Sequence, residues 1–159
     1  MKLILIAAIS QNNVIGNKGR MPWHSKEEFG HFKEKTIGFP VLMGKNTFNS
    51  LGKPLIGRLN IVITSHPELF SQFEDVKCFF NISDALFFCN NGNFEKVFII
   101  GGRRLFEEMM PIADEMMLSR MRFDADGDTF FPEMNFNDWN EVSKEEFNDF
   151  EFVTYTKKK

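Results

Sequence analysis

A glutamate in the first quarter of the chain could carry proton-transfer chemistry. It closes the segment Ser25-Lys26-Glu27-Glu28, whose Ser-x-x-Glu spacing predicts a helix that begins with a capping box. On that helix Glu28 lies on the same side as Phe32, whereas Glu27 lies on a side that we expect to face water. The other residues of the water-facing side are Gly30, His31 and Glu34.

Two roles are open for Glu28. As the last residue of a capping box it would bind back to the first turn of its own helix, a contact worth about 1 kcal/mol. Among the rings of Trp23, Phe29 and Phe32 it would be desolvated, and burial raises the pKa of a carboxyl towards the range useful for proton transfer. The residues alone favour neither role, and the two roles are compatible.

Two glycine-containing turns follow apolar segments and could bind phosphate. Gly101-Gly102 follows Val97-Phe98-Ile99-Ile100, and Met43-Gly44-Lys45-Asn46-Thr47 has the same layout with a cation and a hydroxyl added. At such turns backbone N–H groups can approach an anion at the start of the next helix. A glycine pair alone more often marks only a tight turn. Two such turns, with Thr64-Ser65-His66 after a third strand, indicate a ligand with several phosphates.

The sequence shows no residues arranged for nucleophilic or metal catalysis. The sequence contains no GxGxxG, GxxxxGK[ST], HExxH or GxSxG motif, and its three histidines are not spaced as a metal site. Cys78 and Cys89 match neither a zinc site nor a redox pair, so we expect two reduced cysteines. No metal is expected.

Alternating strand and helix patterns must position these residues. Apolar runs predict strands at 3–9, 40–44, 59–63, 76–80, 96–100 and 116–121. Helices are predicted from Ser25 onwards and at 45–51, 83–89 and 103–110. Two further strands, 139–145 and 150–155, are close enough in sequence to form an antiparallel hairpin.

This order of elements predicts an α/β fold. We expect a mainly parallel sheet of about eight strands, with an antiparallel C-terminal edge hairpin and about four flanking helices. Residues 1–159 are expected to form a single domain. In such sheets ligands bind outside the carboxyl ends of the strands. The segments to consider are those after Ile9, Met43, Ile63, Ile100 and Met121.

Composition and charge argue against several classes of protein. The chain has 19 basic and 22 acidic side chains, and its net charge of −3 offers no general attraction for nucleic acid. No segment approaches the roughly 20 apolar residues of a membrane helix, and the apolar start of the chain lacks a signal-cleavage site. We expect a cytoplasmic protein with no nucleic-acid or membrane partner, and a monomer because no long apolar stripe is exposed.

Several short segments, in their order and spacing, resemble those of dihydrofolate reductases of the short bacterial kind. They are Ile6-Ala7-Ala8, Val14-Ile15-Gly16, Met21-Pro22-Trp23, Met43-Gly44-Lys45-Asn46-Thr47-Phe48, Pro54-Leu55-Ile56-Gly57-Arg58, Ile100-Gly101-Gly102 and Gly127-Asp128-Thr129-Phe130-Phe131-Pro132. The resemblance extends over essentially the whole chain. It implies an NADPH-dependent oxidoreductase that reduces 7,8-dihydrofolate to 5,6,7,8-tetrahydrofolate, supports one-carbon metabolism and thymidylate synthesis, and binds antifolates. It also implies an eight-stranded sheet whose last strand is antiparallel.

For the substrate, the resemblance favours the catalytic role of Glu28, as the single ionisable residue of the pterin pocket. Glu28 would bind the pterin amino group and ring N–H and, with a water near Trp23, assist protonation of N5, while Ser119 would hydrogen-bond its carboxylate. Arg58 would bind the α-carboxylate of the substrate's glutamate. The other implied substrate contacts are Ile6, Ala7, Phe29, Phe32, Ser50, Leu51 and Leu55.

For NADPH, the resemblance implies three groups of contacts. The nicotinamide would lie beside Ala8, Ile15 and Ile100, the pyrophosphate beside Thr47, Gly101, Gly102 and Arg104, and the adenosine 2′-phosphate beside Lys45, Thr64 and Ser65. Further implied contacts are Gly16, Met21, Gly44, Asn46, Ile63, Arg103, Leu105, Phe106 and Thr129. Residues 16–23 resemble a mobile lid that closes over the nicotinamide.

The sequence departs from the common pattern of this family at four positions. Glu28 stands where many relatives have Asp, Lys45 where many have Arg, Phe106 where Tyr is common, and Arg103 where a small residue is usual. Lys45 keeps the charge of Arg without its planar fork. Lys77 is a further candidate contact of the 2′-phosphate.

Two other functions remain open. One is a reductase of the same fold of the riboflavin-pathway type, and the joint presence of Glu28, Phe32 and Arg58 counts against it. The other is a non-catalytic folate or nucleotide binder, and it does not require Trp23, Glu28 and Ser119 together.

Overall fold

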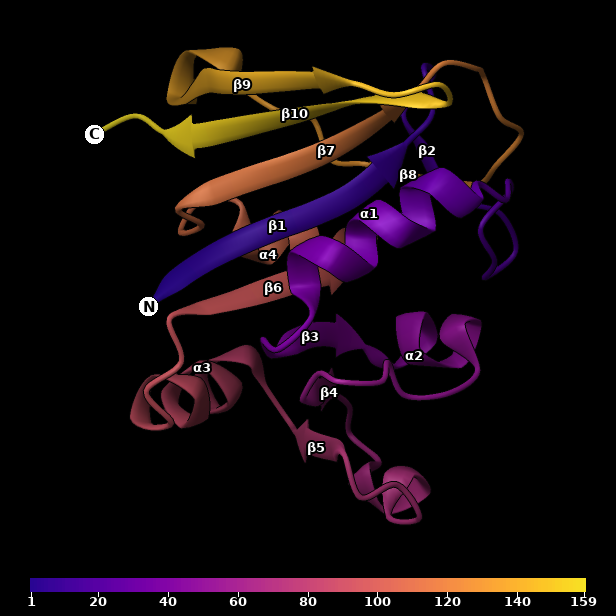
Figure 1. The fold of residues 1–159 in the computed structure, drawn as a ribbon. Helices are drawn as coiled ribbons and strands as arrows, with labels where there is room; N and C mark the ends of the chain where they lie inside the picture. The colour runs from indigo at the N-terminus through magenta and orange to yellow at the C-terminus, as the bar shows by residue number, and fades with distance from the viewer.

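An eight-stranded sheet forms the centre of the molecule in the computed structural model, which describes all 159 residues (Figure 1). Its strands are β1 (Lys2–Ile9), β3 (Val41–Gly44), β4 (Asn60–Ile63), β5 (Val76–Phe79), β6 (Lys96–Gly101), β7 (Glu115–Met121), β9 (Trp139–Glu146) and β10 (Phe150–Lys157). They are ordered β5-β4-β3-β6-β1-β7-β10-β9. Neighbours from β5 to β7 are parallel, whereas β10 is antiparallel to β7 and β9. The predicted fold class is confirmed.

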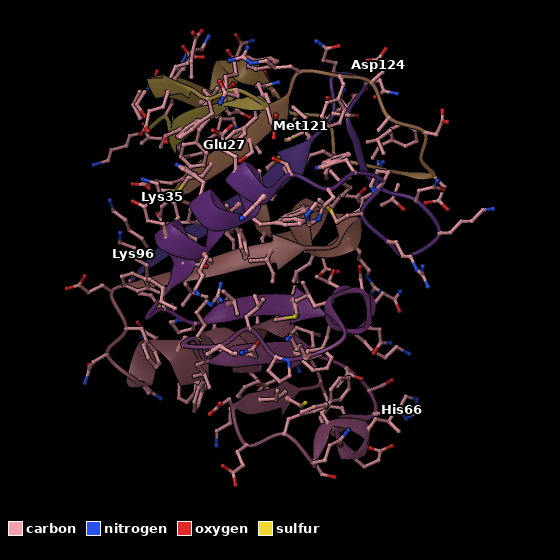
Figure 2. All side chains as sticks on the ribbon, turned by 45° about the vertical axis from the view of Figure 1, so that its right-hand side comes forward. Glu27, Lys35, His66, Lys96, Met121 and Asp124 are labelled. Carbon is pink, nitrogen blue, oxygen red and sulfur yellow. The ribbon has the colours of Figure 1, made fainter.

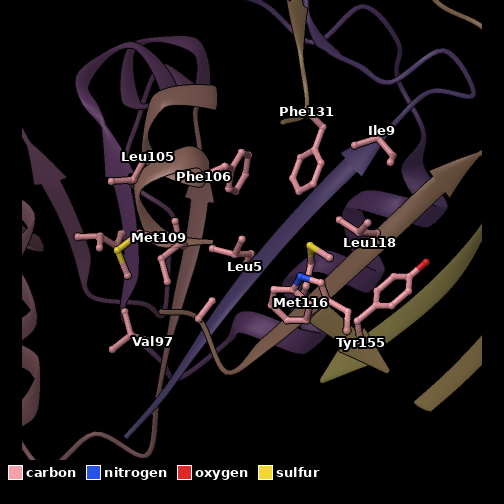
Figure 3. Packing of buried hydrophobic residues seen from close by; sticks show 14 of the residues in the cluster. Leu5, Ile9, Val97, Leu105, Phe106, Met109, Met116, Leu118, Phe131 and Tyr155 are labelled. Atoms are coloured by element: carbon pink, nitrogen blue, oxygen red, sulfur yellow. The ribbon is translucent and has the colours of Figure 1, made fainter. Parts of the chain in front are cut away.

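The central strands are buried on both faces of the sheet. Along β1, Leu5 and Ile9 belong to one apolar cluster, and Ile4 and Ile6 belong to another. Successive side chains of a strand point to opposite faces, so one continuous apolar run fills two cores. Figure 3 shows part of the larger cluster, including Leu5, Ile9, Val97, Leu105, Phe106, Met109, Met116, Leu118, Phe131 and Tyr155.

Four α-helices cover the two faces: α1 (Lys26–Thr36), α2 (Lys45–Leu51), α3 (Ile82–Asn91) and α4 (Arg103–Met109). Buried residues of α3 and α4 share one cluster, whereas Phe32 of α1 and Phe48 of α2 belong with the other. In Figure 1, α1 accordingly crosses in front of the sheet and α4 lies behind it. Two short 3₁₀ helices, η1 (Pro67–Phe70) and η2 (Phe136–Asp138), complete the chain. None of these helices has the length and apolar character needed to cross a membrane.

All the predicted strands and helices are present, with ends that differ by at most two residues. The sequence reasoning missed a second sheet, in which β2 (Val14–Gly16) pairs with β8 (Thr129–Phe130). Strands of three and two residues are too short to show a period-2 pattern. This small sheet joins the first loop of the chain to the loop after β7.

The side of α1 that was predicted to face water is covered in part. His31 is only 8% exposed. The rings of Phe147, Phe150 and Phe152 surround it, with centroid distances of 4.9, 5.8 and 4.2 Å. The prediction was wrong because helical periodicity tells which residues share a side but not what packs against it. Here the hairpin of β9 and β10 does.

Gly127, in the loop that precedes β8, provides a test of the small sheet. A Cβ at this position would lie 2.5 Å from the carbonyl oxygen of Gly16, and it would also clash with Val14. We expect Gly127→Ala to destabilise the protein by about 1–3 kcal/mol. Urea unfolding measures the change.

Gly30 is the matched control, because a Cβ on this exposed residue of α1 meets no atom within 4 Å. Gly30→Ala should stabilise the protein by about 0.5–1 kcal/mol. Equal effects of the two substitutions would mean that the β2–β8 contact is not as described.

Candidate active site

Glu28 lies in the first turns of α1 with its carboxyl buried against β7. The residue is 5% exposed, and the hydroxyl of Ser119 on β7 hydrogen-bonds its carboxyl. Burial raises the pKa of Glu28 to about 7, and the hydrogen bond from Ser119 opposes part of that rise. At neutral pH this side chain therefore populates both protonation states.

The predicted capping box forms only in half. Ser25 is the N-cap of α1, and its Oγ accepts a hydrogen bond from the Glu28 N–H at 3.2 Å. The Glu28 carboxyl does not bind back to Ser25 and is instead bound by Ser119. The backbone of Glu28 thus completes the cap, which leaves its side chain free for the site.

The indole N–H of Trp23 is a second notable group, since it is a buried donor without a partner in the protein. The Trp23 ring meets Phe123 edge-on at 5.5 Å, and it packs with Ala8 against the cluster around Met121. Ala8 pairs with Ser119 across β1 and β7, so Trp23 belongs to the neighbourhood of Glu28. A buried N–H without a partner costs about 1–3 kcal/mol, so such donors usually bind a water or a ligand.

The predicted apolar contacts of the substrate divide into two groups. Phe32 and Leu55 are half-buried and pack on the cluster that contains Ile6. Phe29 and Leu51 remain 38% and 39% exposed. Exposed apolar side chains next to a buried apolar floor form a surface that a flat ring system can cover. Of the other predicted contacts, Ala7 is half-buried and Ser50 is exposed.

Arg58 is a buried cation without an acidic partner. It is 8% exposed, and its Nε and Nη1 donate to the carbonyl oxygen of Ile56 at 3.1 Å and to the hydroxyl of Thr36 at 3.0 Å. Burial lowers the pKa of the Arg58 guanidinium. Both acceptors are neutral, so they orient the guanidinium while its charge is left uncompensated. A carboxylate is the partner that this planar donor fork fits best.

The two glycine turns lie side by side at the carboxyl ends of β3 and β6. Met43 is in register with Gly101, and a Cβ on Gly44 would be 4.0 Å from the Gly101 carbonyl oxygen. Cβ atoms on Gly101 and Gly102 would each be 3.6 Å from the Thr47 hydroxyl. The Gly101–Gly102 peptide bond is cis. The two turns thus form one cradle of backbone and hydroxyl groups, with Phe106 beside Gly101.

The cations predicted to bind phosphate differ in their freedom. Lys45 is exposed and borders a cavity of about 220 Å³ between α2 and η1. Arg103 and Arg104 are also exposed, but each is paired one turn along α4, with Glu107 at 2.6 Å and Glu108 at 3.1 Å. Lys77 lies 5.9 Å from the ring of Phe88 on α3. Lys77 is therefore turned towards α3.

The remaining predicted cofactor contacts vary in exposure. Asn46 and Ser65 are exposed, Ile15, Ile63 and Ile100 are half-buried, and Thr64 is buried with its hydroxyl accepting from the His66 N–H at 3.1 Å. Leu105 is buried in the core beneath α4. No group of three or more His, Cys, Asp or Glu is arranged to hold a metal ion.

The segment that was predicted to act as a lid is attached to the loop before β8. The Asp128 N–H donates to the Gly16 carbonyl oxygen at 3.1 Å, and the Asp128 carboxylate accepts from the Lys18 N–H at 3.1 Å. Hydrogen bonds from Lys18 and Thr129 hold the pKa of Asp128 below its usual value. Met21 lies exposed beyond this attachment.

Three residues of this region have roles that were not predicted from the sequence: Thr36, Asp128 and Asp149. Thr36 orients Arg58, Asp128 holds the lid segment, and the Asp149 carboxylate accepts a hydrogen bond from Ser25 Oγ at 2.7 Å. Each acts on a residue that is distant in sequence, and no local pattern marks such a contact. Figure 2 shows Glu27 on α1 and Met121 at the end of β7, the two elements that meet at Glu28.

Comparison with known proteins places this geometry in a family. The sequence pattern of the dihydrofolate reductase family matches residues 2–157. The dihydrofolate reductase of Bacillus subtilis is 36% identical, covering 96% of this chain and 93% of its own length, and that of Haemophilus influenzae is 39% identical, covering 92% and 88%. A solved structure of the Enterococcus faecalis enzyme, complexed with NADP(H) and RAB-propyl, superposes with a TM-score of 0.88 at 30% identity over 99% of this chain and 97% of its own.

The chain belongs to the dihydrofolate reductase family. The resemblance stated from the short motifs is therefore confirmed, and with it the enzyme class and the cofactor that it implied, an oxidoreductase that uses NADPH.

The raised pKa of Glu28 predicts a stability cost that depends on pH. The folded state binds the proton of Glu28 more tightly than the unfolded chain does, so the protonated carboxyl contributes fully to the free energy of unfolding below pH 4.5. That contribution is lost as the pH rises through about 7. We expect Glu28→Gln to be as stable as the parent near pH 4.5 and more stable by about 3 kcal/mol at pH 8. Urea unfolding at the two pH values tests this, and a stability difference that is the same at both would contradict the buried titration.

Proposed function

We propose that this protein reduces 7,8-dihydrofolate to 5,6,7,8-tetrahydrofolate with NADPH, and that Glu28 handles the proton of the reaction. The observation that carries the residue assignment is the burial of Glu28 beside Ser119, with a pKa of about 7. An acid or base is most effective when its pKa lies near the working pH. We further propose that residues 1–159 act as one domain and as a monomer in the cytoplasm, where the product supports one-carbon metabolism and thymidylate synthesis.

The glycine cradle is the proposed binding site for the phosphates of the cofactor. Side chains at Gly101 and Gly102 would occupy the space next to Thr47, so the absence of Cβ atoms lets a phosphate approach backbone N–H groups there. Gly101, Gly102, Thr47 and Arg104 would hold the pyrophosphate, and Lys45, Thr64 and Ser65 the 2′-phosphate. Bound NADPH supplies the hydride that is transferred to C6 of the pterin.

Glu28 has two tasks in this proposal. Its carboxylate binds the pterin amino group and ring N–H, because an ionised carboxylate accepts both hydrogen bonds at once. Burial also favours the protonated form of the Glu28 carboxyl, which then supplies a proton next to the pterin. The unpartnered Trp23 N–H is suited to hold a water through which that proton reaches N5. Ser119 keeps the carboxyl in place.

Arg58 and the apolar residues bind the rest of the substrate. Phe29, Phe32, Leu51 and Leu55 would contact the pterin and aminobenzoyl rings. The guanidinium of Arg58, oriented by Thr36 and lacking a counter-ion, would bind the α-carboxylate of the glutamate moiety. Antifolates that present a similar ring and a protonated amidine-like edge to Glu28 would compete at the same place.

Turnover is tested directly by mixing the protein with dihydrofolate and NADPH and following the loss of absorbance of the reduced nicotinamide. In that assay we expect Glu28→Gln to lower kcat at pH 7 by about 10²- to 10⁴-fold, because proton transfer loses its acid. Activity should recover in part at low pH, where the substrate can take a proton from solvent.

Glu34→Gln is the matched control for that variant, since Glu34 is an exposed carboxylate on the same helix with no hydrogen-bond partner. It should behave as the parent does. Binding of both ligands without turnover in the parent protein would rule out the proposed reaction, and a Glu28→Gln variant with parental activity at pH 7 would rule out the proposed role of Glu28.

Arg58→Leu should raise KM for dihydrofolate by about 10- to 100-fold, the loss expected for hydrogen bonds between charged groups, and leave KM for NADPH within about twofold. Dihydropteroate, which lacks the glutamate, provides the control substrate. Its kcat/KM should be the same for the parent protein and for the Arg58→Leu variant. An equal loss for both substrates would mean that Arg58 supports the fold and does not bind the carboxylate.

A further inference from the structure

Asp149, in the turn between β9 and β10, makes hydrogen bonds to both elements that flank Glu28. Its carbonyl oxygen accepts from the N–H of Arg122, the first residue after β7, at 3.1 Å. Its side chain accepts from the hydroxyl of Ser25 at 2.7 Å, and its N–H donates to the Glu27 carboxylate at 3.2 Å. One residue thus connects the end of the strand that carries Ser119 to the start of the helix that carries Glu28.

The hydrogen bond to Ser25 acts directly on the backbone of Glu28. A serine hydroxyl has one hydrogen and two lone pairs. When Ser25 gives its hydrogen to Asp149, its lone pairs are left for the Glu28 N–H, which it accepts at 3.2 Å. The Asp149 carboxylate therefore selects the hydroxyl orientation in which Ser25 caps the helix, and the cap fixes the position of the Glu28 backbone.

The turn that carries Asp149 is itself held firmly. The rings of Phe147 and Phe150 stack at 4.6 Å with an interplanar angle of 11°, and both rings contact His31 one turn further along α1. The guanidinium of Arg122 donates to the carbonyl oxygen of Phe147 at 3.2 Å and to that of Phe150 at 3.4 Å. The turn therefore meets the N-cap Ser25 and, within α1, Glu27 and His31, which leaves little freedom for the helix to slide.

We propose that Asp149 is a positioning residue, which holds the start of α1 at the distance from β7 where the Glu28 carboxyl meets Ser119. This inference rests on the proposed role of Glu28. It assigns a part in the reaction to a hairpin turn that holds none of the residues proposed to bind the substrate or the cofactor.

The pKa of Glu28 depends on how deeply its carboxyl is buried, so a displacement of the start of α1 can be measured as a change in that pKa. Burial and the Ser119 hydroxyl are the two causes of its pKa shift, and no charged group of α1, β7 or the hairpin contributes. Of the two, burial is the larger. A start of α1 that moves away from β7 admits water to the carboxyl, and the pKa of Glu28 then falls towards its ordinary value.

The experiment compares four variants by the pH dependence of kcat and by ¹³C NMR titration of the Glu28 carboxyl, assigned with Glu28→Gln. Asp149→Ala removes the acceptor, whereas Asp149→Asn keeps an oxygen that can accept from Ser25. Asn148→Ala is the matched control in the same turn, because Asn148 is exposed and its side chain makes no hydrogen bond. Ser25→Gly removes the link from the other side, and glycine is tolerated at an N-cap.

We expect Asp149→Ala and Ser25→Gly to lower kcat at pH 7 by about tenfold, as a misplaced catalytic group does. Both should shift the midpoint of the pH profile and of the NMR titration down by about half a pH unit or more. Asp149→Asn should stay within about twofold of the parent protein, and Asn148→Ala should match it. If Asp149→Ala does not fold, Ser25→Gly still tests the proposal, because it removes the same hydrogen bond from the other side.

Two results would overturn the inference. One is an Asp149→Ala protein that is less stable but has the parental titration midpoint and kcat. The other is an Asp149→Asn protein as impaired as Asp149→Ala, which would mean that charge and not the hydrogen bond matters. Failure of the proposed function is distinguishable, because the parent protein would then show no turnover, or Glu28→Gln would retain the activity of the parent protein in the same assay.

Discussion

Burial of one carboxyl between the start of α1 and strand β7 is the interaction on which the rest of the site depends. An isolated carboxylate in an apolar setting is costly, and at Glu28 this cost appears as a pKa of about 7. The surrounding structure keeps the carboxyl there against that cost. Ser119 binds the side chain, Ser25 binds the backbone, and the turn at Asp149 ties helix to strand. The free-energy cost of burying Glu28 is thus offset by packing and hydrogen bonds elsewhere in the fold.

Anion binding in this protein is a local property and does not follow from its net charge. The chain carries a charge of −3, although the proposed substrate and cofactor are both polyanions. In the proposed site, Arg58 is suited to bind an anion because its guanidinium is buried and is oriented only by the neutral groups of Thr36 and Ile56. By contrast, Arg103 and Arg104 are paired with glutamates of their own helix. The glycine cradle adds backbone N–H groups, which carry no net charge at all.

Most of the fold and part of the site could be predicted because local patterns encode them. Continuous apolar runs marked the strands buried on both faces, and the Ser25 cap marked the start of α1. The β2–β8 sheet was missed because its strands are too short to show a pattern, and His31 was misplaced because periodicity does not tell what covers a helix. Glu28 remained ambiguous from the residues alone, since the same spacing serves a cap and a buried acid.

The sequence by itself determined the order of strands and helices, the two glycine turns, the presence of a candidate acid at Glu28, and the family. These depend on residue types and spacings within short segments, which are read without knowing what packs on them. Only the tertiary structure decided which way the Glu28 carboxyl turns, that Arg58 has no counter-ion, and that Asp149 connects α1 to β7. The physical reason is that desolvation and hydrogen bonding act between atoms that are close in space. Asp149 and Ser25 are 124 residues apart along the chain, and only folding brings them within 2.7 Å.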